Sequence, residues 1–106
     1  MRISPDDIAA IIDIFSQTLQ GGQARLYLYG SRVDDALKGG DIDLALHISE
    51  PSLRADIQER KYRILALLKQ SIGDQKIDLS IIGDEQLSEP FYVDSLKQSC
   101  LLKHWS

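Results

Sequence analysis

Three aspartates are the residues of this chain whose type and spacing most directly suggest chemistry. Asp41 and Asp43 stand two residues apart in a segment of alternating apolar residues, and Asp78 stands in a similar segment further along. Residues two apart on a strand share a face, so the first two carboxylates should project together. Oxygen ligands of this kind suit Mg²⁺ or Mn²⁺ and do not suit zinc. We therefore expect Asp41, Asp43 and Asp78 to bind two divalent ions about 4 Å apart.

A short turn, Gly30-Ser31-Arg32, is the second chemical feature. Its glycine lets backbone amides and the Ser31 hydroxyl approach phosphate oxygens closely, and Arg32 can neutralise a departing pyrophosphate. Beside two metal ions, such a turn favours phosphoryl or nucleotidyl transfer. Each feature also has an ordinary structural interpretation. The acids could be a solvated strand face, the turn a plain glycine turn with a capping serine, and Arg32 a surface ion pair with Asp34 or Asp35.

Strands are predicted where apolar and polar residues alternate, as they do on strands with one buried face. Three segments show this pattern: residues 24–29, 41–48 and 76–82. A site that uses both Ser31 and Asp41 needs the end of the first strand beside the start of the second, so these two strands should be antiparallel. The helix expected over residues 51–72 would be about 30 Å long, enough to make the second and third strands parallel. Asp78 should then lie level with Asp41 and Asp43.

Helices are predicted where apolar residues recur three and four positions apart. Three segments fit this spacing: residues 5–19, 51–72 and 91–103. The last of them should bury Val93, Leu96 and Cys100. Together the elements predict an α/β (α+β) fold, with a three-stranded mixed sheet whose apolar face is covered by helices and whose polar face carries the acids. We expect one domain over residues 1–106.

Composition excludes several classes of protein. The 106 residues are 43% hydrophobic and 26% charged, which is typical of a packed soluble domain. A net charge of -4 argues against broad binding of duplex nucleic acid. The lone Cys100 forms no internal disulfide, and neither a signal peptide nor a membrane-spanning run is apparent, so we expect a cytoplasmic protein.

Several other polar and aromatic residues are open to more than one interpretation. We expect His47 to be a surface residue at the end of a strand rather than a metal ligand, although it shares the face of Asp43. Tyr27 and Tyr29 could stack on a nucleotide base or simply cover a helix. The basic residues around Arg60 are expected on a solvated helix face.

The order of these motifs resembles a known signature. Gly30-Ser31-Arg32, then Asp41-Ile42-Asp43-Leu44, then Lys76-Ile77-Asp78-Leu79 resembles the pattern of the polymerase-β-type nucleotidyltransferase superfamily. The resemblance spans residues 24–82 and is greatest to the minimal nucleotidyltransferases of prokaryotes. It implies that Gly30 and Ser31 bind a nucleoside triphosphate and that Asp41, Asp43 and Asp78 bind two Mg²⁺ ions.

The same resemblance implies a reaction and a partner. The reaction would be Mg²⁺-dependent transfer of a nucleoside monophosphate, with AMP from ATP as the expected donor group, to a hydroxyl acceptor. Minimal nucleotidyltransferases are frequently encoded beside a helical HEPN protein, so this chain would be an antitoxin that adenylylates a tyrosine of a HEPN ribonuclease; otherwise a second copy should complete the site. Two alternatives remain: a binding module that neutralises its partner by contact, and a subunit of an antibiotic nucleotidyltransferase.

Overall fold

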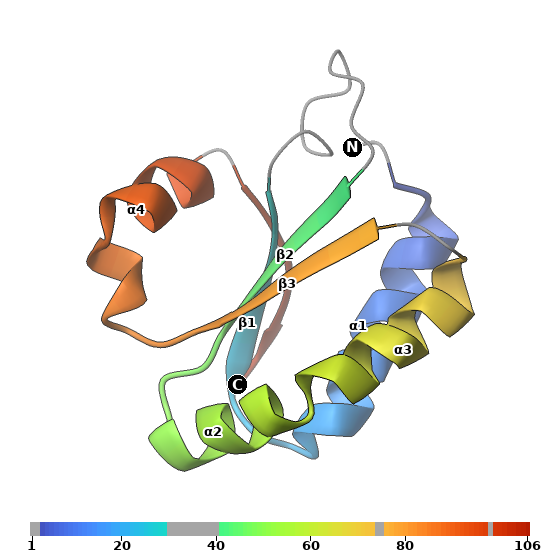
Figure 1. Cartoon of the computed structure of the whole chain (residues 1–106), viewed down its shortest axis with the longest axis horizontal. Coiled ribbons are helices and arrows are strands. Elements are labelled where there is room, and N and C mark those ends of the chain that lie inside the picture. Colours follow the sequence, from blue (N-terminus) through green and yellow to red (C-terminus); the bar gives the residue numbers. More distant parts are fainter. Residues whose placement is uncertain (1–2, 30–40, 74–75, 98) are drawn as a thin grey trace.

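A four-stranded mixed sheet, with the strand order β3-β2-β1-β4, forms the centre of the molecule. The computed structural model describes residues 3–29, 41–73, 76–97 and 99–106. The strands are β1 (Ala24–Tyr29), β2 (Asp41–His47), β3 (Lys76–Ile82) and β4 (Cys100–Trp105). The helices are α1 (Pro5–Leu19), α2 (Pro51–Glu59), α3 (Lys61–Ile72) and α4 (Pro90–Lys97), with a 3-10 turn, η2 (Gln86–Ser88), before the last. Helices α1, α2 and α3 cover one face of the sheet, and α4 lies on the other (Figure 1).

The strand directions agree with those predicted from the sequence. β1 is antiparallel to β2, with Tyr29 opposite Asp43, and β2 is parallel to β3, with Asp43 opposite Asp78. The end of β1 and the starts of β2 and β3 therefore meet at one end of the sheet. This is the end at which the acids and the turn were expected.

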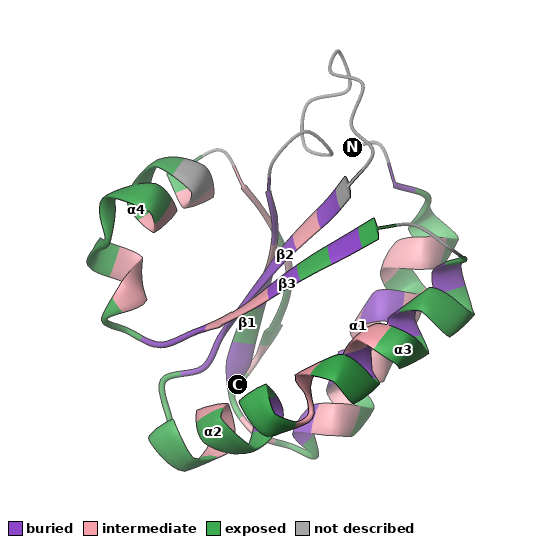
Figure 2. Ribbon diagram, viewed as in Figure 1, coloured by how far each residue is buried: buried purple, intermediate pink, exposed green. Residues whose placement is uncertain are grey.

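Two apolar clusters, one on each face, hold the sheet against its helices (Figure 2). The larger cluster fills the space between the sheet and α1, α2 and α3, and its fully buried members include Phe15, Leu28, Leu44, Leu68 and Leu79. The smaller cluster lies under α4 and consists of Tyr29, Ala45 and Ile82, with Tyr27, Leu87, Tyr92 and Leu96 packed against it. The face predicted to be polar is therefore covered in part by a helix.

The C-terminal segment corrects two predictions. The sequence analysis expected three strands and a helix over residues 91–103, but α4 ends at Lys97 and residues 100–105 pair with β1 as a fourth strand. Ser99 helps to end the helix, because its backbone N–H and its hydroxyl both donate to the carbonyl oxygen of Leu96, at 3.2 and 2.7 Å. The last residues are then free to extend along β1.

Burial changes with this reassignment. Val93, predicted to be buried, is 37% exposed on α4, and Cys100 is half-buried in β4 rather than in a helix core. The new strand is fixed to the other side of the molecule by Trp105, whose indole N–H donates to the Ser16 hydroxyl of α1 at 2.8 Å. Because Ser16 and Trp105 are far apart in the sequence, their contact leaves no trace in the local periodicity of either segment.

The long helix expected over residues 51–72 is interrupted at Arg60. Its backbone (φ -95°, ψ 8°) departs from the helical region and separates α2 from α3. The Arg60 guanidinium donates to Asp56 at 2.6 Å and to the Thr18 carbonyl oxygen at 3.3 Å, so this side chain bridges to α1 and does not lie on a fully solvated face. None of the described helices is long and apolar enough to cross a membrane.

Candidate active site

Asp43 and Asp78 are brought together at the end of the sheet where β2 and β3 begin. They are register partners on adjacent parallel strands, whose backbones lie about 4.8 Å apart. The following residues, Leu44 and Leu79, are buried against the helices, so strand alternation directs both acids to the opposite face. Asp78 is exposed and Asp43 is half-buried. The structure thus places these two acids level with each other, as the strand pattern predicted.

The remaining expected site residues lie around this pair. Asp41 begins β2, and its register partner on β3 is Lys76. Lys76 lies two residues before Asp78, on the same face of β3. The side chain of Asp41 lies outside the described part of the structure. So do the three residues of the expected triphosphate turn: Gly30, Ser31 and Arg32. Because β1 ends and β2 begins at the same end of the sheet, the connection that carries this turn starts and finishes beside the acids.

Chemically, the described acid pair fits a divalent cation. Two carboxylates at facing positions on neighbouring strands repel each other. A cation bound between them would replace this repulsion with attraction to both. Their donor atoms are all oxygen, the preference of Mg²⁺. Among the described side chains no group of three His, Cys, Asp or Glu residues is close enough to hold a metal ion. Asp43 and Asp78 are two of the three expected ligands, and Asp41 would have to be the third.

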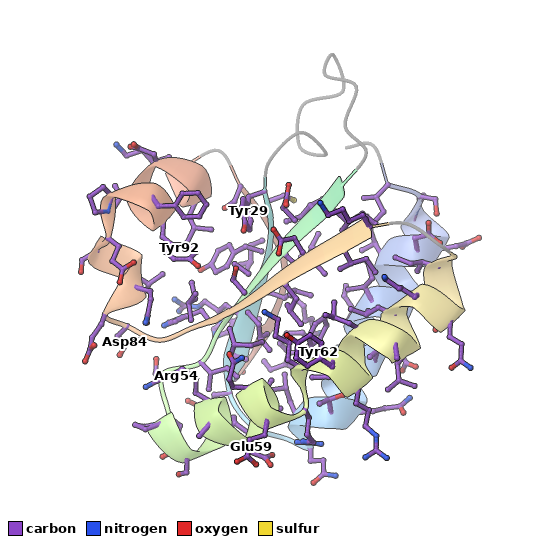
Figure 3. All side chains as sticks on the ribbon, viewed as in Figure 1. Tyr29, Arg54, Glu59, Tyr62, Asp84 and Tyr92 are labelled. Carbon is purple, nitrogen blue, oxygen red and sulfur yellow. The ribbon has the colours of Figure 1, made fainter. Side chains whose placement is uncertain are left out.

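Tyr29 extends the acid pair into a row across three strands, Tyr29–Asp43–Asp78. Its ring is only 7% exposed and meets Phe91 of α4 edge to face, with ring centroids 6.5 Å apart. Burial raises the pKa of the Tyr29 hydroxyl, and the charges of Asp43 and Asp78 raise it further, while a hydrogen bond with Ser80 opposes them. Figure 3 shows Tyr29 between the sheet and α4. Of its two interpretations, covering a helix is the one that these contacts support.

Two neighbours of the acids were not assigned by the sequence analysis. Lys76 is exposed on the same face of β3 as Asp78, and Ser80 is hydrogen-bonded to Tyr29. Both stand two residues from Asp78, so the alternation of the strand was a signal that could have placed them beside the site. Lys76 brings a positive charge to the end of the sheet where the sequence analysis expected a triphosphate.

His47, at the far end of β2, corrects another prediction. It is 7% exposed rather than on the surface, and its Nε2 lies 2.7 Å from Oδ1 of Asp84. The Ser49 hydroxyl donates to the same carboxylate oxygen at 2.8 Å. The hydrogen bonds from His47 and Ser49 lower the pKa of the Asp84 carboxyl. His47 is four residues from Asp43, about 13 Å along the strand, and so lies outside the acid site.

Comparison with known families identifies the family of the domain. Residues 8–103 match the family model described as the nucleotidyltransferase domain. The chain therefore belongs to the nucleotidyltransferase domain family, and the resemblance to that superfamily is confirmed. A search of curated proteins found no significant match. Family membership supports a general activity, the transfer of a nucleoside monophosphate, and a transferase class of enzyme.

Proposed function

We propose that this chain transfers AMP from ATP to a hydroxyl acceptor in a Mg²⁺-dependent reaction. The observation that carries this proposal is the pairing of Asp43 with Asp78 on neighbouring parallel strands of a nucleotidyltransferase domain. The position of Asp41, two residues before Asp43 on β2, supports the proposal, because residues two apart on a strand share a face. Three oxygen ligands at one end of a sheet are a suitable set for Mg²⁺.

Each site residue has a proposed role. Asp41 and Asp43 hold both metal ions, and Asp78 binds one of them and orients the acceptor. Bound Mg²⁺ lowers the pKa of an attacking hydroxyl and stabilises charge on the transferring phosphoryl group. Outside the described residues, Gly30 and Ser31 bind the triphosphate and Arg32 neutralises the pyrophosphate that leaves. The new bond joins the acceptor oxygen to the α-phosphorus, and the α–β phosphoanhydride bond breaks.

The proposed acceptor is a tyrosine of a HEPN-type helical partner. This part of the proposal rests on the resemblance to minimal nucleotidyltransferases, and one surface feature agrees with it. Helix α4 lies on the same face of the sheet as the acids and exposes 60% of Phe91 and 37% of Val93. A helical protein that packed on these side chains would bring its own hydroxyl groups close to Asp43 and Asp78.

The test is a labelling reaction with the purified chain, the product of the adjacent open reading frame, Mg²⁺ and α-phosphate-labelled ATP. We expect label on a tyrosine of the partner, with transfer reduced about 100-fold or more in Asp43→Asn and in Asp78→Asn. Asp13→Asn, which removes an exposed acid from α1 on the other side of the sheet, is the matched control and should keep its activity if the fold is intact. Undiminished transfer in both site variants would disprove the proposed roles.

A second candidate is neutralisation of the partner by contact alone, which the exposed Phe91 and Val93 favour. In that case Asp43→Asn would still silence the partner with no label transferred, whereas Phe91→Ser combined with Val93→Ser would not. The same labelling reaction with aminoglycosides as acceptors tests the further alternative, an antibiotic nucleotidyltransferase subunit.

A further inference from the structure

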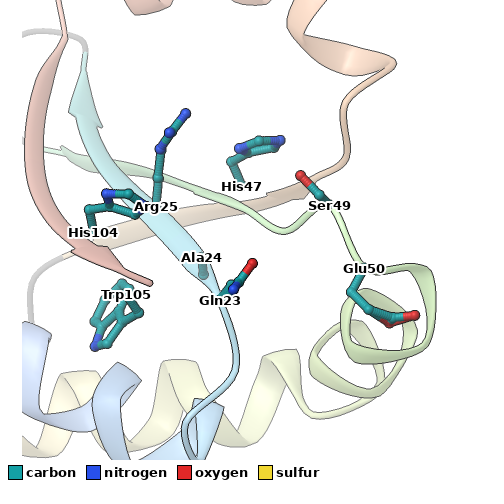
Figure 4. Close-up of a pocket in the computed structure, with 8 residues that line it drawn as sticks. All are labelled: Gln23, Ala24, Arg25, His47, Ser49, Glu50, His104 and Trp105. Carbon is teal, nitrogen blue, oxygen red and sulfur yellow. The ribbon is translucent and has the colours of Figure 1, made fainter.

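A row of basic side chains crosses the sheet at the end opposite the acids. Arg25 of β1 is the register partner of both His47 of β2 and His104 of β4. Facing residues on neighbouring antiparallel strands project from the same face, so His104, Arg25 and His47 form the basic row, shown in Figure 4. Arg25 and Tyr29 are four residues apart on β1, so the basic row lies about 13 Å from the acid site on the same face of the sheet.

A cavity of about 160 Å³ opens over the basic row. Besides the three basic side chains, Ser49, Glu50 and Trp105 line it. Cavities for drug-sized molecules are about 300–1,000 Å³, so this one suits a smaller group. A phosphate with a few attached atoms is of the right size.

The charges around this cavity are not balanced within the described part of the chain. His47 is paired with Asp84 at 2.7 Å, but no hydrogen bond or ion pair joins Arg25 or His104 to another described side chain. A protonated histidine facing the Arg25 guanidinium is unfavourable unless an anion lies between the two groups. The structure therefore leaves at least one permanent positive charge, the Arg25 guanidinium, directed to the cavity without an acid.

Glu50, the acid that lines the cavity, has its charge directed elsewhere. Its carboxylate accepts hydrogen bonds from the backbone N–H groups of Ser52 and Leu53, at 3.0 and 3.2 Å, and from the Ser52 hydroxyl. These bonds cap the N-terminus of α2, and Figure 4 shows the carboxylate beside that helix, away from Arg25. Glu50 thus does not neutralise the basic row.

We propose that the basic row, His104–Arg25–His47, binds the phosphate group of a small molecule. A carboxylate has two oxygens, which a single guanidinium satisfies, whereas a phosphate presents further oxygens to donors on either side. Arg25 and His104, on two neighbouring strands, leave donors facing the cavity, and His47 adds a further donor when its imidazole is protonated, which matches the larger anion. The site is separate from the acid site, and binding there requires no metal ion.

The proposal can be tested by NMR titration of the full chain with inorganic phosphate in the presence of EDTA. We expect saturable shifts of the imidazole signals of His47 and His104. Arg25→Gln should weaken phosphate binding about tenfold, because one charge-assisted hydrogen-bonding group is removed. Arg25 is exposed, so this variant should fold. Arg63→Gln, which changes an exposed arginine of α3, is the matched control and should bind phosphate as the wild type does.

Further titrations separate the possible results. Glycerol 3-phosphate binding more tightly than inorganic phosphate would show that the group arrives on an organic molecule, and equal binding would indicate the free ion; both support the site. Shifts that do not saturate, equal affinity in Arg25→Gln, or equally tight acetate binding would each overturn it.

Discussion

Asp43 and Asp78 face each other across the parallel strands β2 and β3. Their spacing is set by backbone hydrogen bonds, and the register of those strands is in turn set by buried neighbours, Leu44 and Leu79. A slip of one residue in either strand would turn the acid of that strand into the core and expose its leucine. The positions of the two carboxylates therefore depend on core packing rather than on a loop.

Removing one of these acids should weaken the binding of divalent ions. We expect Asp43→Asn to reduce the affinity for Mn²⁺ or Mg²⁺ at least about tenfold, since a charged oxygen ligand is replaced by a neutral one. Isothermal calorimetry, or Mn²⁺ relaxation enhancement, measures this directly. Asp13→Asn should leave the affinity unchanged, and equal affinities in all three proteins would contradict a metal site at Asp43.

The core beneath the acids should be sensitive to truncation. Leu44 is fully buried, so Leu44→Ala should lower the free energy of unfolding by about 2–5 kcal/mol. Leu67, which is 42% exposed on α3, serves as the control, and Leu67→Ala should cost less than about 1 kcal/mol. Urea unfolding followed by circular dichroism compares the two. Similar losses in both variants would mean that the sheet does not pack as described.

The Tyr29 hydroxyl should report on its neighbours. Its pKa lies above the usual 10.0 because the ring is buried and Asp43 and Asp78 are close. Asp43→Asn should lower this pKa, since a nearby negative charge is removed, and Ser80→Ala should raise it, since the hydrogen bond that lowers it is lost. The Cζ chemical shift of Tyr29, followed by NMR against pH, measures both changes. Shifts in the opposite directions would contradict the described row.

Stability should depend on pH through Asp84. Its pKa in the folded protein is below the usual 3.8 because His47 and Ser49 are hydrogen-bonded to the carboxylate. A lowered pKa stabilises the fold above 3.8, and that contribution is lost as the pH falls through the folded value. The stability difference between wild type and Asp84→Asn should therefore be largest near neutral pH and shrink below pH 3.8. Urea midpoints across this range test it, and a difference that grows with acidity would refute it.

The contact between β4 and α1 should make a measurable contribution. Ser16→Ala leaves the Trp105 indole N–H without its partner and should cost about 1 kcal/mol. Trp105 is the only tryptophan of the chain, so its fluorescence follows the change directly. Thr18→Val on the same helix is a useful comparison, because the Thr18 hydroxyl bonds only within α1, to Ile14.

Strand alternation explains why much of the central sheet was predictable. In β2 every second residue is apolar and buried, and this one pattern gives the strand, its face and the side on which Asp43 lies. The direction of β3 was predicted from the length of the helical segment between β2 and β3. The prediction is confirmed, although Arg60 divides that segment into two helices. The roles of Gly30, Ser31, Arg32 and Asp41 remain predictions.

Contacts between distant residues explain what the sequence did not reveal. Val93, Leu96 and Cys100 have helical spacing. Cys100 nevertheless belongs to a strand, because the backbone of residues 100–105 pairs with the edge of β1. From the sequence, His47 is expected at the exposed end of a strand. In the structure it lies beside Asp84, thirty-seven residues away. Local periodicity cannot reveal that the edge of β1 is available for pairing, or that the Asp84 carboxylate lies beside His47.

β1 has a hydrogen-bonded neighbour on each side, β2 and β4. The register of its last residue, Tyr29, against Asp43 is thus fixed from both sides. The next strand, β2, begins at Asp41 beside it. Both attachment points of residues 30–40 are anchored by the rest of the fold. A substitute for residues 30–40 would therefore join the same two strand ends, and the acids of β2 and β3 would keep their positions because the paired strands hold them.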